Sequence, residues 1–273
     1  MTDQADRFDR FASGYAHYWA PVLAPAVRQL LDEVEPRAGR PERILDVGTG
    51  TGQLALGALD RWPRATVDGV DVSTGMIAVA RAEAERALGR RSRTRFSIEI
   101  APADQVPFED DRFDLAMSSF VYQLVPSRAR AYREARRVLR PGGILAFVSW
   151  LDDDRVFRPD QLFDEILERL DIEPRVFDGR PGDLPSVERA AGELRHAGFS
   201  DVSAHAGTLE HTFGVDDYVE FMADFDEESL FDELEPAMRK RLETTLRDEL
   251  TRLTPDELTM RFPIVFVMGR RSR

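Results

Sequence analysis

Apolar and polar positions follow two rhythms along the first 150 residues of the chain. Short apolar runs predict β-strands, and between them apolar residues recur every three or four positions, as on one face of a helix. Strands are predicted at 43–47, 65–70, 94–100, 113–118 and 143–149. Helices are predicted at 53–61, 73–88 and 127–139. This alternation is typical of βαβ units and predicts a parallel sheet covered by helices on both faces.

Further elements are predicted on either side of this core. An amphipathic helix is expected at 21–35, because Pro21 suits a first turn and Pro36 and Gly39 end the apolar stripe. Beyond residue 150 the pattern predicts helices at 159–170 and 186–197, strands at 201–212 and 262–269, and a helical stretch at 215–253. A helical insertion of this kind is expected over the carboxyl edge of the sheet, where open α/β folds bind ligands.

A glycine-rich loop follows the first predicted strand. Residues 44–52 read Ile-Leu-Asp-Val-Gly-Thr-Gly-Thr-Gly, and a helix opens at Gln53. Glycines there allow a tight turn and a close approach to a ligand, and the helix N-terminus offers N–H groups. The dinucleotide fingerprint would require a third glycine where Gln53 stands, and the phosphate-binding P-loop would require a lysine. The loop therefore predicts a nucleotide-type cofactor other than a dinucleotide or ATP.

The D-x-G-x-G-x-G pattern at 46–52 resembles the first motif of class I S-adenosylmethionine (SAM) dependent methyltransferases. The resemblance continues in Val-Asp-Gly-Val-Asp-Val-Ser at 67–73, Ala-Asp-Gln-Val-Pro-Phe at 103–108 with Phe-Asp at 113–114, and Leu-Arg-Pro-Gly-Gly at 139–143. The nearest subgroup is that of the ubiquinone and menaquinone biosynthesis methyltransferases. The resemblance implies a Rossmann-like α/β fold: a mostly parallel seven-stranded sheet with an antiparallel edge strand and helical cap segments.

The resemblance also implies which residues hold the SAM cofactor. Asp71 is expected to bind both ribose hydroxyls rather than to cap the next helix, because Ser73 already suits that role. Asp104 is expected to meet the adenine amino group, although loop aspartates are often turn formers, and Met76 to pack on adenine, although helical methionines are often core residues. The expected cofactor-binding residues are Tyr15, Asp46, Gly48, Thr49, Gly50, Gly52, Asp71, Val72, Met76, Ala103, Asp104, Gln105, Ser119 and Phe120.

The aromatic segment 8–19 resembles an F-D-x-x-A-x-x-Y stretch that closes over SAM in related enzymes, with ordinary helix packing as the alternative. Ala16 departs from that pattern, since relatives often carry an acid there. The residues expected to line the acceptor pocket are Tyr18, Trp19, Tyr122, Gln123 and Trp150. Methyl transfer needs a base only when the acceptor is protonated, and His17 is the favoured candidate over the other three histidines.

Composition narrows the alternatives. The chain has 273 residues, a net charge of −13 and no cysteine, which excludes disulfides, zinc–thiolate sites and thiol nucleophiles. The charge disfavours nucleic-acid partners, and the arginines at 130–140 are interpreted as a solvated helix face. The aspartates at 152–154 are interpreted as a solvated loop, so no metal is expected. The N-terminus lacks a signal-like apolar region and no run reaches membrane length, so a cytoplasmic protein is expected.

A single domain spanning 1–273 is therefore predicted. Its expected parts are an N-terminal helical lid (1–35), a SAM-binding core (36–150), acceptor-side cap segments (151–198 and 213–255) and edge strands (199–212 and 256–273). The predicted function is methyl transfer from SAM to O, C or N of a small molecule by in-line displacement. The alternatives are a non-catalytic SAM-binding sensor or scaffold and a protein or peptide methyltransferase. The sequence leaves the acceptor and the oligomeric state open.

Overall fold

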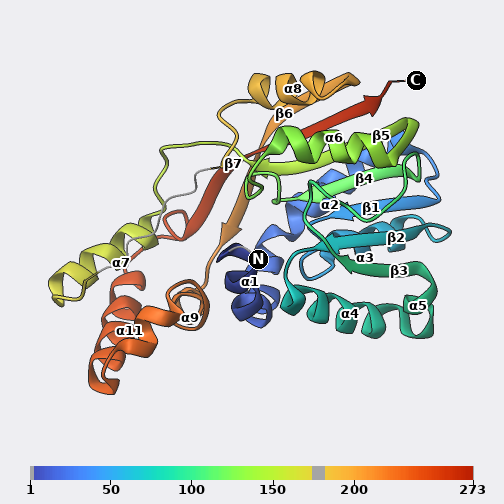
Figure 1. Ribbon diagram of the computed structural model, residues 1–273. Coiled ribbons are helices and arrows are strands. Elements are labelled where there is room, and N and C mark those ends of the chain that lie inside the picture. The colour runs from blue at the N-terminus through green and yellow to red at the C-terminus, as the bar shows by residue number, and fades with distance from the viewer. Residues whose placement is uncertain (1–2, 174–181, 273) are drawn as a thin grey trace. The chain divides into compact units, whose positions relative to one another are not determined.

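A computed structural model describes residues 3–173 and 182–272, which contain a seven-stranded sheet ordered β3-β2-β1-β4-β5-β7-β6 (Figure 1). The strands are β1 (Arg43–Val47), β2 (Thr66–Asp71), β3 (Phe96–Ile100), β4 (Phe113–Ser119), β5 (Leu139–Trp150), β6 (Phe199–Thr212) and β7 (Thr259–Arg271). Strands β1 to β5 pair in parallel, and β7 runs antiparallel to β5. The predicted Rossmann-like fold is confirmed. The antiparallel strand is β7, which lies between β5 and the edge strand β6.

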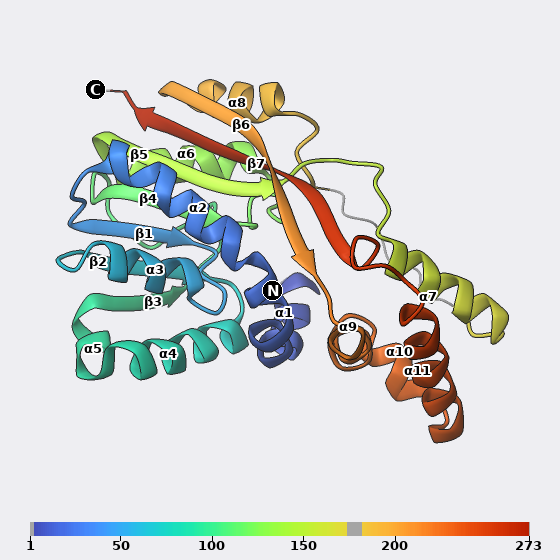
Figure 2. The same cartoon turned by 180° about the vertical axis from the view of Figure 1, so that it is seen from behind.

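Helices cover both faces of the sheet. Figures 1 and 2 show α2 (Ala20–Ala38) and α3 (Gln53–Arg61) over one face and α6 (Arg128–Val138) over the other. The remaining helices of this part are α4 (Thr74–Leu88), the short α5 (Ser92–Arg95) and α8 (Val187–His196). The stripe on α2 is buried through Leu23, Val27, Leu30 and Leu31, as the apolar spacing predicts.

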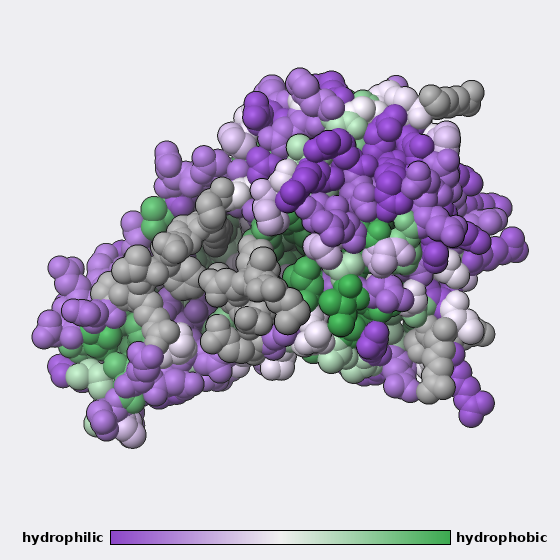
Figure 3. Space-filling view, viewed as in Figure 1, coloured by the Kyte–Doolittle hydropathy of each residue, from purple (hydrophilic) through white to green (hydrophobic). Residues whose placement is uncertain are grey.

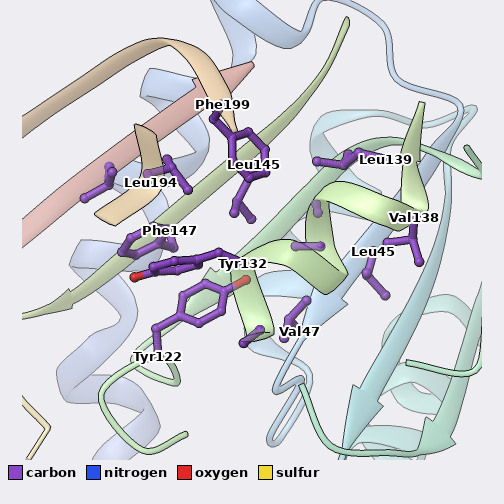
Figure 4. Close-up of a cluster of buried hydrophobic side chains, with 14 of the residues drawn as sticks. Leu45, Val47, Tyr122, Tyr132, Val138, Leu139, Leu145, Phe147, Leu194 and Phe199 are labelled. Carbon is purple, nitrogen blue, oxygen red and sulfur yellow. The ribbon is translucent and has the colours of Figure 1, made fainter. Parts of the chain in front are cut away.

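A core cluster of large side chains fills the space around α6 and the central strands (Figure 4). Leu45 and Val47 enter it from β1, Phe147 from β5 and Tyr132 from α6, and all are almost fully buried. The rings of Tyr132 and Phe147 stack with centroids 5.5 Å apart. Because truncation of a buried aromatic ring costs about 3–5 kcal/mol, this cluster fixes α6 firmly on the sheet.

Residues Asp153–Pro181 and Thr208–Phe262 form a second compact unit. Its described helices are α7 (Arg158–Arg169), α9 (Val215–Phe221), a π-helical turn (Met222–Asp226), α10 (Glu228–Glu233) and α11 (Pro236–Leu250). The Tyr218 hydroxyl donates to Asp160 Oδ1 at 2.7 Å, and the Phe163 and Phe231 rings stack. The expected cap segments overlap this unit, but α8 belongs to the first unit, where Leu194 joins the core cluster. The role of the second unit as a cap stays a prediction.

The N-terminal segment is helical throughout its described length. Helix α1 (Asp3–Gly14) continues through a π-helical turn (Tyr15–Trp19) directly into α2. The Asp9 carboxylate accepts hydrogen bonds from Ser73 Oγ at 2.6 Å and from Gly75 N at 2.8 Å, so α1 is fastened to the first turn of α4. A Cβ on Gly75 would lie 2.8 Å from the Asp9 carbonyl oxygen, which shows how closely the two helices approach.

None of the helices among residues 3–173 and 182–272 combines the length and apolar character needed to cross a membrane.

Replacing Gly75 with alanine is expected to displace α1, because the added methyl group has no room against the Asp9 backbone. Overpacking of this kind typically costs roughly 1–3 kcal/mol in the free energy of unfolding. The matched control is Gly192→Ala in α8, where a Cβ meets nothing within 4 Å and helix propensity predicts a gain of roughly 0.5–1 kcal/mol. Denaturant unfolding and limited proteolysis measure both variants; a Gly75→Ala protein with wild-type resistance before Ala20 would contradict tight docking of α1.

Candidate active site

The glycine loop turns sharply at the carboxyl end of β1. Gly48, Gly50 and Gly52 all have positive φ, at 69°, 53° and 87°. Glycine is required at position 48 for two reasons: its φ is positive, and a Cβ there would lie 2.3 Å from the Val121 side chain. The N–H groups of Gly48 and Thr49 both donate to the Val70 carbonyl, at 2.8 and 2.9 Å. The loop is thereby held between the ends of β2 and β4 before α3 begins.

Asp71 connects this loop with α4. Its Oδ2 accepts the Gly50 N–H at 2.8 Å, and its Oδ1 accepts the Ser73 N–H at 2.9 Å. Ser73 caps α4 by accepting the Met76 N–H at 3.0 Å, so the capping role does fall on Ser73. Burial raises the pKa of the Asp71 carboxyl, and the neighbouring charge of Asp9 adds to the effect. A carboxylate has about four acceptor positions, so acceptor capacity remains for a ligand.

Asp46 is a buried acid directly beneath the glycine loop, with 1% of its surface exposed. The Thr49 hydroxyl donates to its Oδ2 at 2.8 Å, whereas its Oδ1 is buried with no hydrogen-bond partner among the described residues. Burial raises the pKa of the Asp46 carboxyl to about 7, and the charge of Asp71 contributes. An unpaired buried acceptor is costly, so this oxygen suits a ligand that brings a cationic or N–H donor group.

The N-terminal segment reaches the same acids. Burial and the charge of Asp71 raise the pKa of the Tyr15 hydroxyl, which puts Tyr15 within electrostatic range of Asp71. His17 is exposed, and its ring packs edge-on against Tyr18 with centroids 4.5 Å apart. Tyr15 thus lies near Asp71, while its contact with a cofactor and the role of His17 as a base stay predictions.

The loop after β3 supplies the residues expected at the base of the cofactor. Asp104 is 13% exposed and pairs with Arg130 of α6 at 3.0 Å, while Gln105 is exposed. Met76 is 2% exposed inside α4. Val72 directly follows β2 and is exposed, and Ala103 lies in the loop after β3.

Aromatic rings gather after β4 and β5. Phe120 has a φ of 56°, and its ring lies 4.4 Å from that of Trp150, which in turn lies 6.5 Å from Trp19. The Gln123 amide donates to the Phe120 carbonyl at 2.7 Å and accepts from the Ser149 hydroxyl at 2.7 Å. The side chain of Gln123 therefore braces this turn, and Ser119 ends β4 beside it.

Tyr122 lies elsewhere than the sequence led us to expect. Its side chain is 1% exposed and packs in the core cluster, with its ring 4.8 Å from Tyr132 and 4.9 Å from Phe147 (Figure 4). This position supports a packing role rather than contact with an acceptor.

Sequence reasoning missed three sets of contacts at the site: the Asp9 cap on α4, the Gln123–Ser149 brace, and the pairing of α6 with the loop after β3. The first had a signal in the F-D pair at 8–9, and the others depend on tertiary contacts that periodicity does not encode. Among the described residues no three His, Asp or Glu side chains converge as a metal site.

The fold and this site define a Rossmann-like protein with two acids, Asp46 and Asp71, beside a glycine-rich loop at the carboxyl edge of its sheet. A methyltransferase domain family matches residues 45–147. The malonyl-[acyl-carrier protein] O-methyltransferase of Geobacter sulfurreducens is 37% identical over 56% of this chain and 55% of that protein. The ubiquinone/menaquinone biosynthesis C-methyltransferase of the same organism is 41% identical over 37% of this chain and 39% of that protein. The chain thus spans about half or less of these two relatives.

A third relative is matched over most of its length. The ubiquinone/menaquinone biosynthesis C-methyltransferase of Methylobacterium nodulans is 37% identical over 74% of each chain. The chain therefore belongs to the SAM-dependent methyltransferases.

Solved structures agree on the fold. A Haemonchus contortus phosphoethanolamine N-methyltransferase with bound S-adenosylhomocysteine matches 90% of this chain and 53% of that one, with a TM-score of 0.56 and 20% identity. The [4+2]-cyclase SpnF matches 91% of this chain and 82% of that one, with a TM-score of 0.57 and 23% identity. At these identities the likeness establishes the fold alone.

Asp46→Asn is expected to change how stability depends on pH in the ligand-free protein. With its native pKa near 7 and an ordinary value of 3.8, Asp46 binds a proton in the folded state that the unfolded chain releases between these pH values. Its contribution to stability therefore falls as pH rises from about 4 to 7 and then levels off. The variant lacks this loss, so its free energy of unfolding relative to wild type should rise by roughly 2 kcal/mol between pH 5 and 8.

Denaturant titrations across that range measure the difference, with Asp60→Asn on the exposed side of α3 as the control. A difference between Asp46→Asn and wild type that does not change with pH would show that Asp46 is not protonated on folding.

Proposed function

We propose that this chain binds SAM at the carboxyl edge of β1 to β5 and transfers its methyl group to a small molecule. The observation that carries the proposal is the Asp71 carboxylate, fixed by the N–H groups of Gly50 and Ser73 at the end of β2. A carboxylate fixed in this way accepts hydrogen bonds from a pair of neighbouring hydroxyls, as on an unmodified ribose.

The other contacts to the cofactor follow from the same arrangement. Asp46 Oδ1, buried and without a partner among the described residues, suits the ammonium group of the methionine end. Thr49, Gly50 and Gly52 form the loop along the methionine and ribose, and Gly48 lets Val121 close against it. Residues proposed at the base are Val72, Met76, Ala103, Asp104 and Gln105. Tyr15 is proposed to close over the ribose side, and Ser119 and Phe120 to face the sulfonium.

Bound SAM supplies an activated methyl group and a good leaving group, so the chain's task is alignment and exclusion of water. Phe120, Trp150 and Trp19 support this task, because the Trp150 ring at the end of β5 lies 4.4 Å from the Phe120 ring and 6.5 Å from the Trp19 ring. Rings of this kind favour a small, neutral or hydrophobic acceptor. Tyr18 and Gln123 are proposed beside them, and His17 would act only if the acceptor must lose a proton.

The N-terminal segment is proposed as a lid, and the cap segments that lie within the second unit, without α8, are proposed on the acceptor side. The capping of α4 by Asp9 and the electrostatic effect of Asp71 on Tyr15 support the first role. The transferred atom can be O, C or N. The relatives' names refer to C-methylation in ubiquinone and menaquinone biosynthesis and to O-methylation of malonyl-[acyl-carrier protein], and these activities belong to those proteins. A cytoplasmic location and the absence of nucleic-acid partners stay predictions.

Asp71→Ala is expected to weaken binding of S-adenosylhomocysteine by about 1.5–3 kcal/mol, the range for hydrogen bonds to a charged group. This corresponds to roughly tenfold to over a hundredfold in Kd. Calorimetry with S-adenosylhomocysteine, NAD and ATP measures it, with Asp60→Ala as the control and Asp71→Asn as a milder variant. Unchanged affinity in folded Asp71→Ala would show that the ribose is bound elsewhere, and comparable affinity for NAD would reject the proposed cofactor.

Turnover separates an enzyme from a SAM sensor. We expect the protein to form S-adenosylhomocysteine from SAM in the presence of some members of a panel of phenols, quinols and small amines. Product formation is followed by mass spectrometry, with Asp71→Ala as the inactive control. Tight SAM binding without turnover on any small molecule, but with methylation of a peptide, would favour the protein methyltransferase alternative.

A further inference from the structure

Helix α6 holds the loop that carries Asp104. Three of its side chains, Arg130, Glu134 and Arg137, lie at positions i, i+4 and i+7 and so share one face of the helix. The Val106 N–H donates to Glu134 Oε1 at 3.0 Å. Arg137 donates to the carbonyls of Val106 and Phe108 at 3.2 and 2.8 Å and pairs with Glu134 at 2.7 Å. The loop is thus fixed at Val106 and at Phe108 by one face of the helix.

Arg130 is the member of this face that touches the acid itself. Its Nη2 lies 3.0 Å from Asp104 Oδ2, with the arginine side chain 57% exposed and the aspartate 13% exposed. A carboxylate has about four acceptor positions, so an ion pair through Oδ2 leaves acceptor capacity on Oδ1. The arginine therefore holds the carboxylate in one orientation without occupying both of its oxygens.

An ion pair this exposed contributes little to folding, since exposed pairs are typically worth 0.2–1 kcal/mol. The ion pair matters more for ligand recognition, because it sets the orientation of the Asp104 carboxylate. A fixed carboxylate attracts the 6-amino group of adenine, which donates hydrogen bonds, and repels the 6-carbonyl oxygen of hypoxanthine. Discrimination between two ligands is increased by such a repulsive contact as well as by the attractive one.

We propose that Arg130 is a positioning residue that orients Asp104 to distinguish a 6-amino from a 6-oxo purine. This assignment rests on the proposed SAM site, in which Asp104 meets the base. The arginines at 130–140 are interpreted from the sequence as a solvated helix face. For Arg130 and Arg137 that interpretation is replaced, because both contact the loop after β3. Figure 3 shows a predominantly hydrophilic surface over this part of the molecule, so exposure alone does not separate these arginines from their neighbours.

Arg133 provides a matched control. It lies on the same helix, is exposed, and donates through Nε to the Ala129 carbonyl of its own helix at 3.1 Å. Arg133→Ala removes the same charge as Arg130→Ala without touching the loop. A difference between the two variants therefore reports the contact with Asp104 rather than the net charge.

The test compares the Kd of S-adenosylhomocysteine with that of its 6-oxo analogue, S-inosylhomocysteine, by calorimetry. Wild-type protein and Arg133→Ala are expected to prefer the 6-amino ligand by the same factor. Arg130→Ala should reduce that preference roughly three- to fivefold, the equivalent of an ion pair near the upper end of the exposed range. Arg130→Lys should recover part of it, and the thermal midpoint should stay at the wild-type value in all three.

The outcomes distinguish a failure of the role of Arg130 from a failure of the proposed SAM site. An equal preference in Arg130→Ala and Arg133→Ala, or a loss of affinity for both ligands by one common factor, would overturn the role of Arg130. Asp104→Asn carries an amide that can donate to a 6-oxo group, so it should lose or invert the preference. If Asp104→Asn binds with the wild-type preference, the base is recognised elsewhere; if wild-type protein binds neither ligand, the proposed function itself fails.

Discussion

The hydrogen bonds that Asp71 accepts from Gly50 and Ser73 organise the rest of the site. One carboxylate at the end of β2 fixes the glycine loop after β1 and the first turn of α4. Ser73 in turn donates to Asp9, which brings α1 onto the same turn. Three segments that are far apart in the sequence are thus aligned by a single chain of polar contacts. A ligand that binds Asp71 joins a network that is already in place, which lowers the entropy lost on binding.

The same network concentrates negative charge. Asp46 and Asp71 are both acids of raised pKa, and each owes most of that rise to burial. Ionisation of two buried carboxylates is unfavourable, because an ionised acid loses its hydration on burial. A ligand with an ammonium and a sulfonium group offsets this penalty. The site is therefore electrostatically matched to a cationic ligand, which agrees with its membership of the SAM-dependent methyltransferases.

Periodicity and turn chemistry predicted most of the core fold, since β1 and α3 have the boundaries that the apolar runs and the glycine loop indicate. The positions expected on the cofactor side could be assigned to one edge of the sheet because parallel strands present their carboxyl ends there, and their contact with a cofactor stays a prediction. The burial of Tyr122 could not be predicted, because its packing against Tyr132 and Phe147 is a tertiary contact that sequence spacing does not encode. Arg130 and Arg137 could not either, because their partners lie in a loop more than 20 residues away and helix spacing does not encode such contacts.

The likeness to SpnF, a cyclase, shows that this fold alone does not fix the reaction. A methyltransferase must align the acceptor with the methyl group, and the turn at Phe120 is the part of this chain that we propose for that alignment. A left-handed conformation costs a non-glycine residue roughly 1–2 kcal/mol, and it persists only where neighbours hold it. Gln123 and Ser149 do so by fixing the Phe120 carbonyl, while Trp150 fixes the ring. The strain is thus located at the residue proposed to face the sulfonium, and the acids proposed to hold the cofactor lie at the ends of other strands.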